Sequence, residues 1–280
     1  MSSMKTTMSP LRLDDIRDAS DLSARWNDVD VLTLPFGGRS PYVVGFVCSD
    51  KALEETQRLR YEVFNVELGE GLASSELSGL DRDEYDDQMT HLVLVDPEEN
   101  RIVGTYRLQA ARHALRHRGL YAAQEYDLAQ LEPYFDHLTE LGRACLAQDH
   151  RTLPAIMQLW LGVGAFMNLH DQRYLFGCCS LTTQDPDDGW RAMKTIRMRH
   201  YLHEKLYLPA LPSHSCGMAS RENDTELGDP LPLPKLFRTY MRLGVQVISE
   251  PAIDREFRTV DFLVLLDGYE VQLSRLDILK

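Results

Sequence analysis

The sequence predicts an α/β protein with one mixed β-sheet flanked by helices. Runs of β-branched and aromatic residues alternate with segments of helical spacing along most of the chain, which is typical of a single α/β domain. Neither an internal repeat nor a low-complexity tract interrupts this alternation. Residues 1–40 are polar, leave room for one short helix and end in the turn-rich P-F-G-G-R-S-P. We therefore expect an N-terminal arm over residues 1–40 and a single domain over residues 41–280.

Composition and charge argue against several classes of protein. Of the 280 residues, 44% are hydrophobic and 26% are charged, as in soluble globular proteins. No apolar run approaches the roughly 18 residues of a transmembrane helix, and the start M-S-S-M-K-T-T-M-S-P lacks the apolar core of a secretory signal. The adjacent Cys178 and Cys179 lie in an apolar run, which indicates reduced thiols and a cytoplasmic protein. A net charge of −13 argues against nucleic-acid binding.

The individual elements follow from local patterns. Strands are predicted at residues 42–48, 91–95, 102–108, 138–146, 174–181, 245–249 and 259–266, where β-branched, aromatic and apolar residues gather. Helices are predicted from Ser49 past Phe64 and at residues 154–169, 186–206 and 235–243. Ser49 or Asp50 can cap the first helix. In the second helix, Gly162 and Gly164 suggest close packing on the sheet. Residues 110–136 form a polar insertion, and residues 208–234 a proline-rich link.

The loop over residues 70–88 is too long to be an idle connection. Five acidic groups fall within seven positions, namely Asp81, Asp83, Glu84, Asp86 and Asp87, and Leu80 and Tyr85 can anchor them. A calcium site is one interpretation, but the spacing lacks the glycine and terminal glutamate of an EF-hand. The other is a pocket that recognises a cationic small molecule.

The predicted strand 138–146, L-T-E-L-G-R-A-C-L, carries two opposite charges, Glu140 and Arg143. Charges in a buried strand are costly unless they are paired. Positions three apart point to opposite faces of a strand, so these side chains can share a face only if a bulge adds a residue between them. Gly142 is a natural place for that bulge. From the residues alone, a structural ion pair and an active site remain equal alternatives.

Two basic clusters stand out from the acidic background. They comprise Arg112, His113, Arg116, His117 and Arg118, and Arg191, Lys194, Arg197, Arg199 and Lys205. Solvated helix faces would explain them, and a dock for an acidic partner protein is the alternative. Neither G-x-S-x-G nor a P-loop motif occurs. His200, His203, His214 and Cys216 match no zinc spacing, so we expect no metal site. Cys145 has no base nearby in sequence, and we expect a packed thiol.

Several motifs, in this order, resemble a known family. They are R-Y-E-V-F-N-V-E-L-G (60–69), D-R-D-E-Y-D-D-Q-M-T-H-L-V-L-V-D (81–96), I-V-G-T-Y-R-L (102–108), E-L-G-R-A-C (140–145), L-W-L-G-V (159–163), L-F-G-C-C-S (175–180) and E-P-A-I-D-R-E-F-R-T-V-D-F-L-V-L-L (250–266). Together they resemble GNAT-fold N-acyltransferases that use acyl carrier protein, and most closely the ornithine lipid N-acyltransferases, historically labelled hemolysin-like. Arg60, Phe64, the acidic loop, Arg107, Glu140 and Arg143 also resemble the pattern of the acyl-homoserine-lactone synthases.

The resemblance implies a GNAT-like, splayed sheet in which strand 138–146, with its β-bulge, parts from strand 174–181. In that family the donor's pantetheine arm lies in the parting, and a backbone N–H of the bulge polarises the thioester carbonyl. The turn that cradles pyrophosphate in acetyl-CoA users is replaced here by Q-D-H-R-T-L-P, which contains Arg151 but no glycine. This departure favours acyl carrier protein as donor, with no cofactor beyond that co-substrate. Carrier proteins are acidic, which favours the docking interpretation of the basic clusters.

The resemblance implies transfer of a 3-hydroxyacyl group from acyl carrier protein to the α-amine of ornithine, forming lyso-ornithine lipid. Catalytic roles are expected for Glu140, Arg143 and Asp86, with Asp83 as another candidate base. Substrate-binding roles are expected for Arg60, Phe64, Asp83, Glu84, Arg107, Cys145 and Arg151. Of Arg60, Arg107 and Arg143, at least one should only brace the loop against the sheet. The alternatives are an N-acyltransferase for another amine, such as an N-acyl amino acid or acyl-homoserine-lactone synthase, and a non-catalytic module that binds acyl carrier protein.

Because the expected product is a lipid, this cytoplasmic protein could also contact the inner membrane peripherally. The segment 235–243, with Leu236, Phe237, Tyr240 and Leu243, could make that contact, although we expect it to be a core-packed helix.

Overall fold

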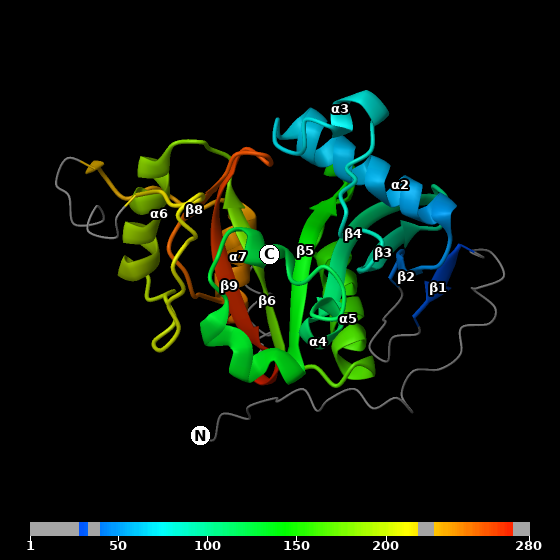
Figure 1. The fold of residues 1–280 in the computed structure, drawn as a ribbon. Helices are drawn as coiled ribbons and strands as arrows, with labels where there is room; N and C mark the ends of the chain where they lie inside the picture. Colours follow the sequence, from blue (N-terminus) through cyan, green and yellow to red (C-terminus); the bar gives the residue numbers. More distant parts are fainter. Residues whose placement is uncertain (1–27, 33–39, 218–226, 271–280) are drawn as a thin grey trace, which may run out of the picture.

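The computed structural model describes residues 28–32, 40–217 and 227–270, which form an open sheet with helices on both sides (Figure 1). The described strands are β1 (Val29–Val31), β2 (Val43–Val47), β3 (Thr90–Asp96), β4 (Arg101–Ala110), β5 (Leu138–Leu146), β6 (Tyr174–Leu181), β7 (Gln246–Val247), β8 (Ala252–Asp254) and β9 (Thr259–Asp267). Their order in the sheet is β1-β2-β3-β4-β5-β6-β9-β7, and β8 also pairs with β9. Every neighbouring pair is antiparallel except β5 and β6, which are parallel. The predicted mixed α/β sheet is confirmed.

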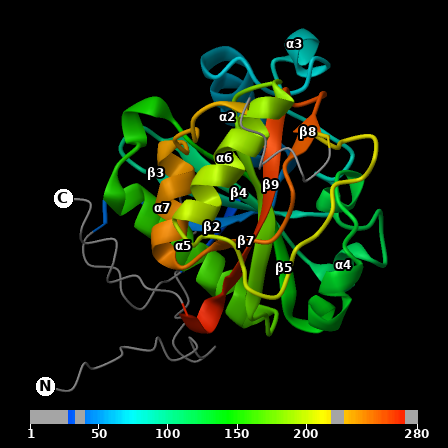
Figure 2. The same cartoon turned by 90° about the vertical axis from the view of Figure 1, so that its left-hand side faces the viewer.

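Helices cover both sides of this sheet. They are α2 (Asp50–Tyr61), which continues as a π-helix (Glu62–Glu67), α3 (Ser75–Ser78), α4 (Ala111–Ala114), α5 (Leu153–Leu169), α6 (Pro186–Met198) and α7 (Lys235–Leu243). Short 3₁₀ turns occupy Tyr121–Gln124, Ala129–His137, Gln148–His150 and Gly268–Glu270. Figure 2 shows α5 and α7 on one side of the sheet and α4 on the other.

Local chemistry sets where the main helices begin and how closely they pack. The Ser49 hydroxyl accepts a hydrogen bond from the backbone N–H of Ala52 at 3.2 Å and caps α2, as predicted. Gly162 of α5 lies against β3, because a Cβ there would come within 2.7 Å of Leu92 Cδ1. Nothing lies within 4 Å of a Cβ at Gly164. The close packing predicted for the two glycines is therefore confirmed for Gly162 alone.

Three features differ from the elements that the sequence predicts. Helix α6 ends at Met198 rather than at residue 206, and His200 just beyond it adopts a left-handed φ of 57°. Strand β1 lies within the segment expected to be an arm, and pairs with β2. Strand β8 is also additional to the prediction. Both strands span three residues, which is shorter than any window in which alternation can be recognised. The short helix allowed for in the arm would lie outside the described residues.

The sheet divides between β5 and β6. The two strands pair over only three positions, from Leu138 with Tyr174 to Glu140 with Phe176. Figure 1 shows them close together at one end and parting toward the other. A Cβ at Gly177 would collide with the carbonyl oxygen of Leu141, so glycine permits the close approach just where the strands separate.

A β-bulge lies in β5 immediately after this division. Thr105 of β4 pairs with Cys145, whereas Arg107 pairs with Gly142, so one residue of β4 opposes Arg143 and Ala144 of β5. Arg143 has a left-handed φ of 50°, a region that non-glycine residues seldom occupy. The predicted bulge and splayed sheet are both confirmed, and the bulge brings residue 143 to the same cavity as Glu140.

Candidate active site

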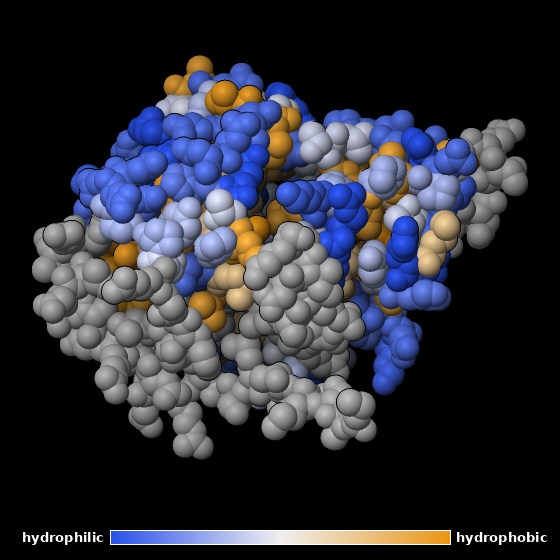
Figure 3. Space-filling model, turned by 180° about the vertical axis from the view of Figure 1, so that it is seen from behind, coloured by the Kyte–Doolittle hydropathy of each residue, from blue (hydrophilic) through white to orange (hydrophobic). Residues whose placement is uncertain are grey.

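A cavity of about 520 Å³ lies where β5 and β6 part. This volume falls within the roughly 300–1,000 Å³ of small-molecule sites. Its lining runs along β5 from Glu140 to Leu146 and along β6 from Cys178 to Ser180. Much of the remaining lining is apolar and includes Val63, Phe64, Ile156, Leu159, Phe237 and Tyr240. Seen from behind, apolar residues also show between hydrophilic ones near the middle of the molecule (Figure 3).

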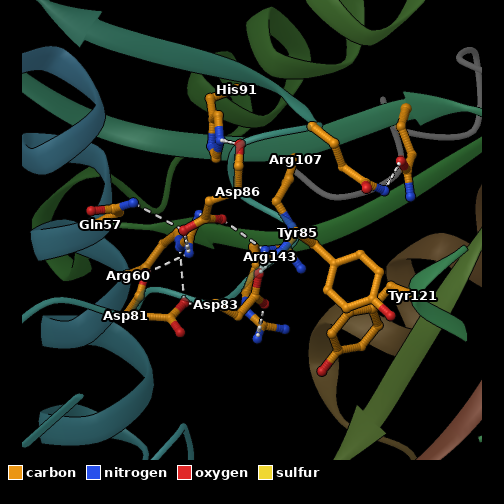
Figure 4. A network of polar contacts seen from close by, with 12 residues as sticks. Gln57, Arg60, Asp81, Asp83, Tyr85, Asp86, His91, Arg107, Tyr121 and Arg143 are labelled. Carbon is orange, nitrogen blue, oxygen red and sulfur yellow. Dashed lines mark hydrogen bonds and ion pairs between the residues drawn. The ribbon is translucent and has the colours of Figure 1, made fainter. Parts of the chain in front are cut away.

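Beside this cavity, three arginines and three aspartates form a closed cycle of ion pairs, which we call the Arg–Asp ring (Figure 4). In order around the cycle its members are Arg60, Asp81, Arg143, Asp83, Arg107 and Asp86. Each carboxylate bridges two guanidinium groups. The aspartates come from the acidic loop, and the arginines come from α2, β4 and the β5 bulge, so the ring joins the loop to three elements.

The distances within the Arg–Asp ring are those of charge-assisted hydrogen bonds. Arg60 donates from Nε to Asp81 Oδ2 at 2.9 Å and from Nη1 and Nη2 to the Asp86 carboxylate at 3.0 Å. Arg107 Nη1 donates to Asp83 Oδ1 at 2.6 Å and to Asp86 Oδ1 at 2.7 Å. Arg143 donates from Nε to Asp81 at 3.1 Å and from Nη2 to Asp83 at 2.9 Å.

Residues around the Arg–Asp ring add hydrogen bonds to Asp86, whereas Asp81 Oδ1 and Arg107 Nε are buried without a hydrogen-bond partner among the described residues. Gln57 Nε2 donates to Asp86 Oδ2 at 2.9 Å, and His91 Nε2 lies 3.0 Å from the Asp86 carbonyl oxygen. Burial would raise the pKa of Asp86, but Arg60 and Arg107 outweigh it and hold that pKa well below its usual value. Burial would likewise raise the pKa of Asp83, but Arg107 and Arg143 hold it below the usual value. Both carboxylates are therefore weak bases that are already paired with cations.

The other acidic groups of the loop lie outside the Arg–Asp ring. Glu84, expected to bind substrate, pairs with Arg118 at 2.8 Å on the surface and does not line the cavity. Asp87 is exposed. Tyr85 is buried, and its ring packs edge-on against Tyr121 with centroids 5.2 Å apart, as Figure 4 shows. The loop is thus anchored by Tyr85, one of the two predicted apolar anchors.

Glu140 lines the cavity and is held by β4 and the insertion rather than by the acidic loop. Its Oε2 accepts hydrogen bonds from Gln109 Nε2 at 2.6 Å and from the backbone N–H of Tyr121 at 2.9 Å. Its Oε1 accepts a single hydrogen bond, from the backbone N–H of Ala122 at 2.8 Å. Burial raises the pKa of Glu140, although these three donors oppose that shift. Oε1 keeps a lone pair for a further donor.

The bulge orients Glu140 and Arg143 toward one cavity, but not toward each other. Both side chains belong to the cavity lining. Arg143 is committed to the Arg–Asp ring, and its guanidinium also lies over the rings of Tyr121 at 5.1 Å and Phe257 at 4.4 Å. Within the described residues, no ion pair joins Glu140 to Arg143. The simple buried pair considered from the sequence is therefore replaced by two separate sets of contacts.

Some of the remaining predicted site residues line the cavity, and the others support the Arg–Asp ring from outside the lining. Phe64 lines the cavity, with its ring 5.3 Å from that of Phe257. Cys145 also lines it, and burial raises the pKa of its thiol to about 12, so it is a packed thiol as expected. Arg151 lines its exposed edge and pairs with Glu67 at 2.5 Å. Arg60 and Asp86 are fully enclosed and lie outside the lining, where they brace the Arg–Asp ring.

Four residues of the site have no role in the sequence-based prediction. Tyr121, from the insertion, lines the cavity between Glu140 and Arg143. Asp254 of β8 and Asp261 of β9 line its other wall, and Glu125 lies beside Asp261. The two aspartates fall within the motif E-P-A-I-D-R-E-F-R-T-V-D-F, which carries the family resemblance and could have singled them out. Glu125 and Tyr121 have no local sequence signal.

The two basic clusters contact many acceptors of the protein itself. Arg112 pairs with Asp136 at 2.6 Å, and Arg118 with Glu84. Arg191 pairs with Asp188 at 2.9 Å, and Lys194 donates to the Gly228 carbonyl oxygen at 3.2 Å. Their expected role as a docking surface stays a prediction.

Helix α7 packs into the core, as expected. Phe237, Tyr240, Met241 and Leu243 are buried, whereas Leu236 is 45% exposed. Among the described helices, none has the length and apolar character needed to cross a bilayer.

Comparison with known proteins agrees with the resemblance read from the motifs. Residues 59–161 match the acetyltransferase (GNAT) domain model. The chain is 32% identical over 232 residues to an L-ornithine N(alpha)-acyltransferase of Rhodobacter capsulatus, covering 81% of this chain and 90% of that relative. It is 29% identical over 228 residues to the enzyme of the same name from Brucella abortus, covering 78% and 81%.

Among solved structures, a CoA-dependent acyl-homoserine lactone synthase with MTA is similar at a TM-score of 0.43 and 15% identity, over 82% of this chain and 81% of that one. This protein is an acyltransferase and belongs to the family of the L-ornithine N(alpha)-acyltransferases.

Proposed function

We propose that this protein transfers a 3-hydroxyacyl group from acyl carrier protein to the α-amine of L-ornithine, which yields lyso-ornithine lipid. The names of the relatives support ornithine as the acceptor and its α-nitrogen as the position acylated. The structural observation that carries the proposal is the position of Glu140, a buried carboxylate with a remaining lone pair, in the cavity beside the β5 bulge.

The reaction is aminolysis of a thioester. The acceptor nitrogen attacks the carbonyl carbon, a C–N bond forms, the C–S bond breaks, and the thiol of the donor leaves. The acceptor must lose a proton, because only the neutral amine is nucleophilic. Glu140 Oε1 receives that proton directly or through water, and burial raises the pKa of Glu140 toward the range in which a general base is effective. Asp83 and Asp86 are poorer bases, because their pKa values are lowered and they lie outside the cavity lining.

The donor arm would occupy the parting of β5 and β6. Beyond Glu140, β5 no longer pairs with β6, and its residues from Leu141 to Leu146 line the cavity. A backbone N–H of this segment can donate to the oxygen that becomes negatively charged in the transition state. Such a donor contributes about 2.7–4 kcal/mol in enzymes of acyl transfer. The apolar lining, with Ile156, Leu159 and Phe237 among its members, has the character needed to hold the acyl chain.

The carrier protein would dock where the cavity meets solvent. The exposed lining residues include Lys235 and Leu236 at the start of α7 and Leu68 and Arg151 on the opposite side. Carrier proteins are acidic, and basic residues around an apolar opening favour their approach. The basic clusters around Arg112 and Arg191 are a second candidate for this dock.

The test is a product assay. Purified protein is incubated with 3-hydroxyacyl carrier protein and single amino acids, and the amide is sought by mass spectrometry while released thiol is titrated. We expect one amide per thiol with ornithine, and a lower rate when acyl-CoA replaces the carrier protein. If an amide forms with another amine but not with ornithine, that amine replaces ornithine as the assigned acceptor. Absence of an amide with every amine would overturn the proposal in favour of a carrier-binding module.

A further inference from the structure

The cavity wall opposite Glu140 carries a second group of acidic residues, which we call the Glu125–Asp254–Asp261 cluster. The three side chains are buried, with residue exposures of 2%, 7% and 4%. Asp261 pairs in register with Ser180 of β6 and with Ala252 of β8, and Asp254 pairs with Thr259, so the two aspartates are diagonal neighbours on one face of the β8–β9 ladder. Both line the cavity.

Glu125 reaches this group from the insertion. The Tyr126 hydroxyl donates to the Asp261 carbonyl oxygen at 2.8 Å, which ties the segment that carries Glu125 to β9. As a result, one carboxylate oxygen of Glu125, one of Asp261 and the Cys178 sulfur all lie within 4.8 Å of one another. Two carboxylates from segments distant in sequence are thus held close together in the interior.

The cluster lacks the cations that satisfy the Arg–Asp ring. Glu125 Oε2 and Asp261 Oδ1 are buried atoms without a hydrogen-bond partner. Within residues 28–32, 40–217 and 227–270, no ion pair involves Glu125, Asp254 or Asp261. Arg143 is the nearby cation that lowers the pKa of Glu125, but its Nε and Nη2 donate to Asp81 and Asp83, and it forms no ion pair with Glu125 among the described residues.

Such an arrangement is unfavourable without a ligand. Neighbouring buried carboxylates repel each other and lose hydration, so they take up protons or a cation. Burial and the neighbouring carboxylates raise the pKa of Asp261 to about 7, and burial with Asp261 and Asp254 raises that of Glu125 well above its usual value. The acidic loop was expected from the sequence to bind a cationic acceptor, but four of its carboxylates are paired with arginine, three in the Arg–Asp ring and Glu84 with Arg118. In the Glu125–Asp254–Asp261 cluster, by contrast, no described cation pairs with the carboxylates: Glu125 Oε2 and Asp261 Oδ1 lack a hydrogen-bond partner, and Asp254 Oδ1 accepts from the backbone N–H groups of Glu256 and Phe257.

We propose that the Glu125–Asp254–Asp261 cluster binds the side-chain ammonium group of the acceptor amino acid and so selects a diamino acid over a neutral one. The inference rests on the proposed function, since it places the α-amine at Glu140 and the second amine at the opposite wall. An ammonium group supplies several N–H donors, which match the unpartnered oxygens of Glu125 and Asp261. A site built for such a donor discriminates strongly against an analogue without it, because its polar groups then stay unpaired.

The test compares two acceptors that differ in the side-chain amine. Norvaline has the carbon skeleton of ornithine but lacks that amine. We expect Asp261→Asn and Glu125→Gln each to lower the ratio of kcat/KM for ornithine to that for norvaline by about 10- to 100-fold, mainly through the KM of ornithine. Asp171→Asn, at a side chain that is 98% exposed, is the matched control and should leave the ratio unchanged. A ratio that stays at the wild-type value in both cluster variants would overturn the proposal.

A binding measurement separates this inference from the proposed function. Ornithine and 1,4-diaminobutane are titrated calorimetrically into wild-type protein and Asp261→Asn without an acyl donor. We expect at least about 10-fold weaker binding of both ligands to the variant. If both ligands bind the wild type more tightly than Asp261→Asn but no ornithine amide forms in the product assay, the proposed function fails and the ammonium site stands. Equal binding to both proteins overturns the site. A Zn²⁺ titration without amine completes the test. If the wild type binds Zn²⁺, Asp261→Asn abolishes this binding, and neither ornithine nor 1,4-diaminobutane binds the wild type, the cluster is assigned to a metal instead.

Discussion

Asp83 accepts a hydrogen bond from Arg107 through one carboxylate oxygen and from Arg143 through the other, at 2.6 and 2.9 Å. Arg107 lies on β4, and Arg143 is the bulge residue of β5, so Asp83 fastens the loop to both strands where β5 parts from β6. The left-handed φ of Arg143 carries a strain on the order of 1–3 kcal/mol. The hydrogen bonds of Arg143 to Asp81 and Asp83 offset this strain. The Arg–Asp ring therefore maintains the bulge from which the cavity is built.

Arg60→Met should strongly destabilise the protein. Arg60 is fully buried, and its removal leaves Asp81 and Asp86 each without one of their two guanidinium partners. Loss of one partner of a buried charge network costs about 3–5 kcal/mol. Urea unfolding followed by circular dichroism measures this difference in the free energy of unfolding.

Arg58→Met is the matched control for that experiment. Arg58 lies on the same helix and pairs with Glu54 at 2.8 Å, but both side chains are more than half exposed. An exposed i,i+4 pair contributes about 0.3–0.5 kcal/mol. A similarly small effect for Arg60→Met would show that the Arg–Asp ring does not stabilise the fold.

The Arg–Asp ring should also make the stability of the protein depend on pH in the acidic range. The folded-state pKa values of Asp83 and Asp86 lie below the unfolded value of about 3.9. Their contribution is present above that unfolded value and is lost as the pH falls below about 4 through the folded-state values. We expect the melting temperature to drop between about pH 4 and pH 2.5. Asp83→Asn should be less stable at pH 7 and show a shallower drop, and an unchanged profile would contradict this assignment.

Glu140→Gln should remove most of the catalysis at a moderate cost in stability. Glutamine cannot take the proton of the amine, and when its oxygen accepts from Ala122 its NH2 group faces the Tyr121 N–H that donated to Oε2, which costs about 1–3 kcal/mol. Loss of a general base lowers kcat by about 10²- to 10⁴-fold. Steady-state rates with saturating donor and acceptor provide the measurement, and a melting temperature above the assay temperature guards against misfolding. If kcat stays within about 10-fold of the wild type, another carboxylate of the cavity takes the proton.

Strand β5 could be predicted from its local pattern, and the residues showed that Glu140 and Arg143 share a strand face only if a bulge adds a residue between them. The resemblance to GNAT enzymes turned that condition into the prediction of a bulge. The sequence also singled out most members of the Arg–Asp ring. It could not predict that the ring closes, because that depends on where α2, β4 and the loop meet in space. As a result, Asp83 and Asp86 looked available for a ligand when their oxygens are already occupied.

The Glu125–Asp254–Asp261 cluster was missed for a similar reason. Asp261 is an isolated acidic residue in an apolar strand, and Glu125 lies in an insertion far from it in sequence. The motif around Asp261 could have singled that residue out, but nothing local distinguishes Glu125 from a solvated residue or indicates that the two meet. The register of β6, β8 and β9 places Asp261 and Asp254 on one cavity wall, and the Tyr126 hydrogen bond holds Glu125 beside them.

Asp261→Asn should stabilise the protein at high pH, opposite in sign to the effect of the Arg–Asp ring. The folded-state pKa of Asp261 is about 7, raised by burial and by Asp254, with Glu70 also raising it and the Ser180 and Thr259 hydroxyls opposing. The unfolded value is about 3.9. The folded state therefore holds the extra proton between these values, and stability falls as the pH rises from about 4 to about 7. The melting temperature of the variant should equal or exceed that of the wild type at pH 8, with the gap smallest near pH 4. A variant less stable at pH 8 would indicate a structural role for the charge.

Gly177→Ala should disturb the point at which the sheet divides. A Cβ at this position meets the carbonyl oxygen of Leu141, which is backbone and cannot move aside as the end of a flexible side chain could. Forcing extra volume into such a contact costs about 1–3 kcal/mol. The strands would separate at or before Glu140, so kcat/KM should fall by more than the loss of folded protein explains.

Gly142→Ala provides the comparison for stability, because residue 142 lies next to Leu141 on β5 and a Cβ there meets nothing within 4 Å. Its φ lies outside the left-handed region, so alanine is tolerated and should change the free energy of unfolding by no more than about 1 kcal/mol, in the stabilising direction. Urea unfolding of the two variants measures the contrast. If Gly177→Ala were as stable and as active as the wild type, the contact between Gly177 and Leu141 would not determine where β5 leaves β6, and the bulge with its Arg–Asp ring would have to set the parting alone.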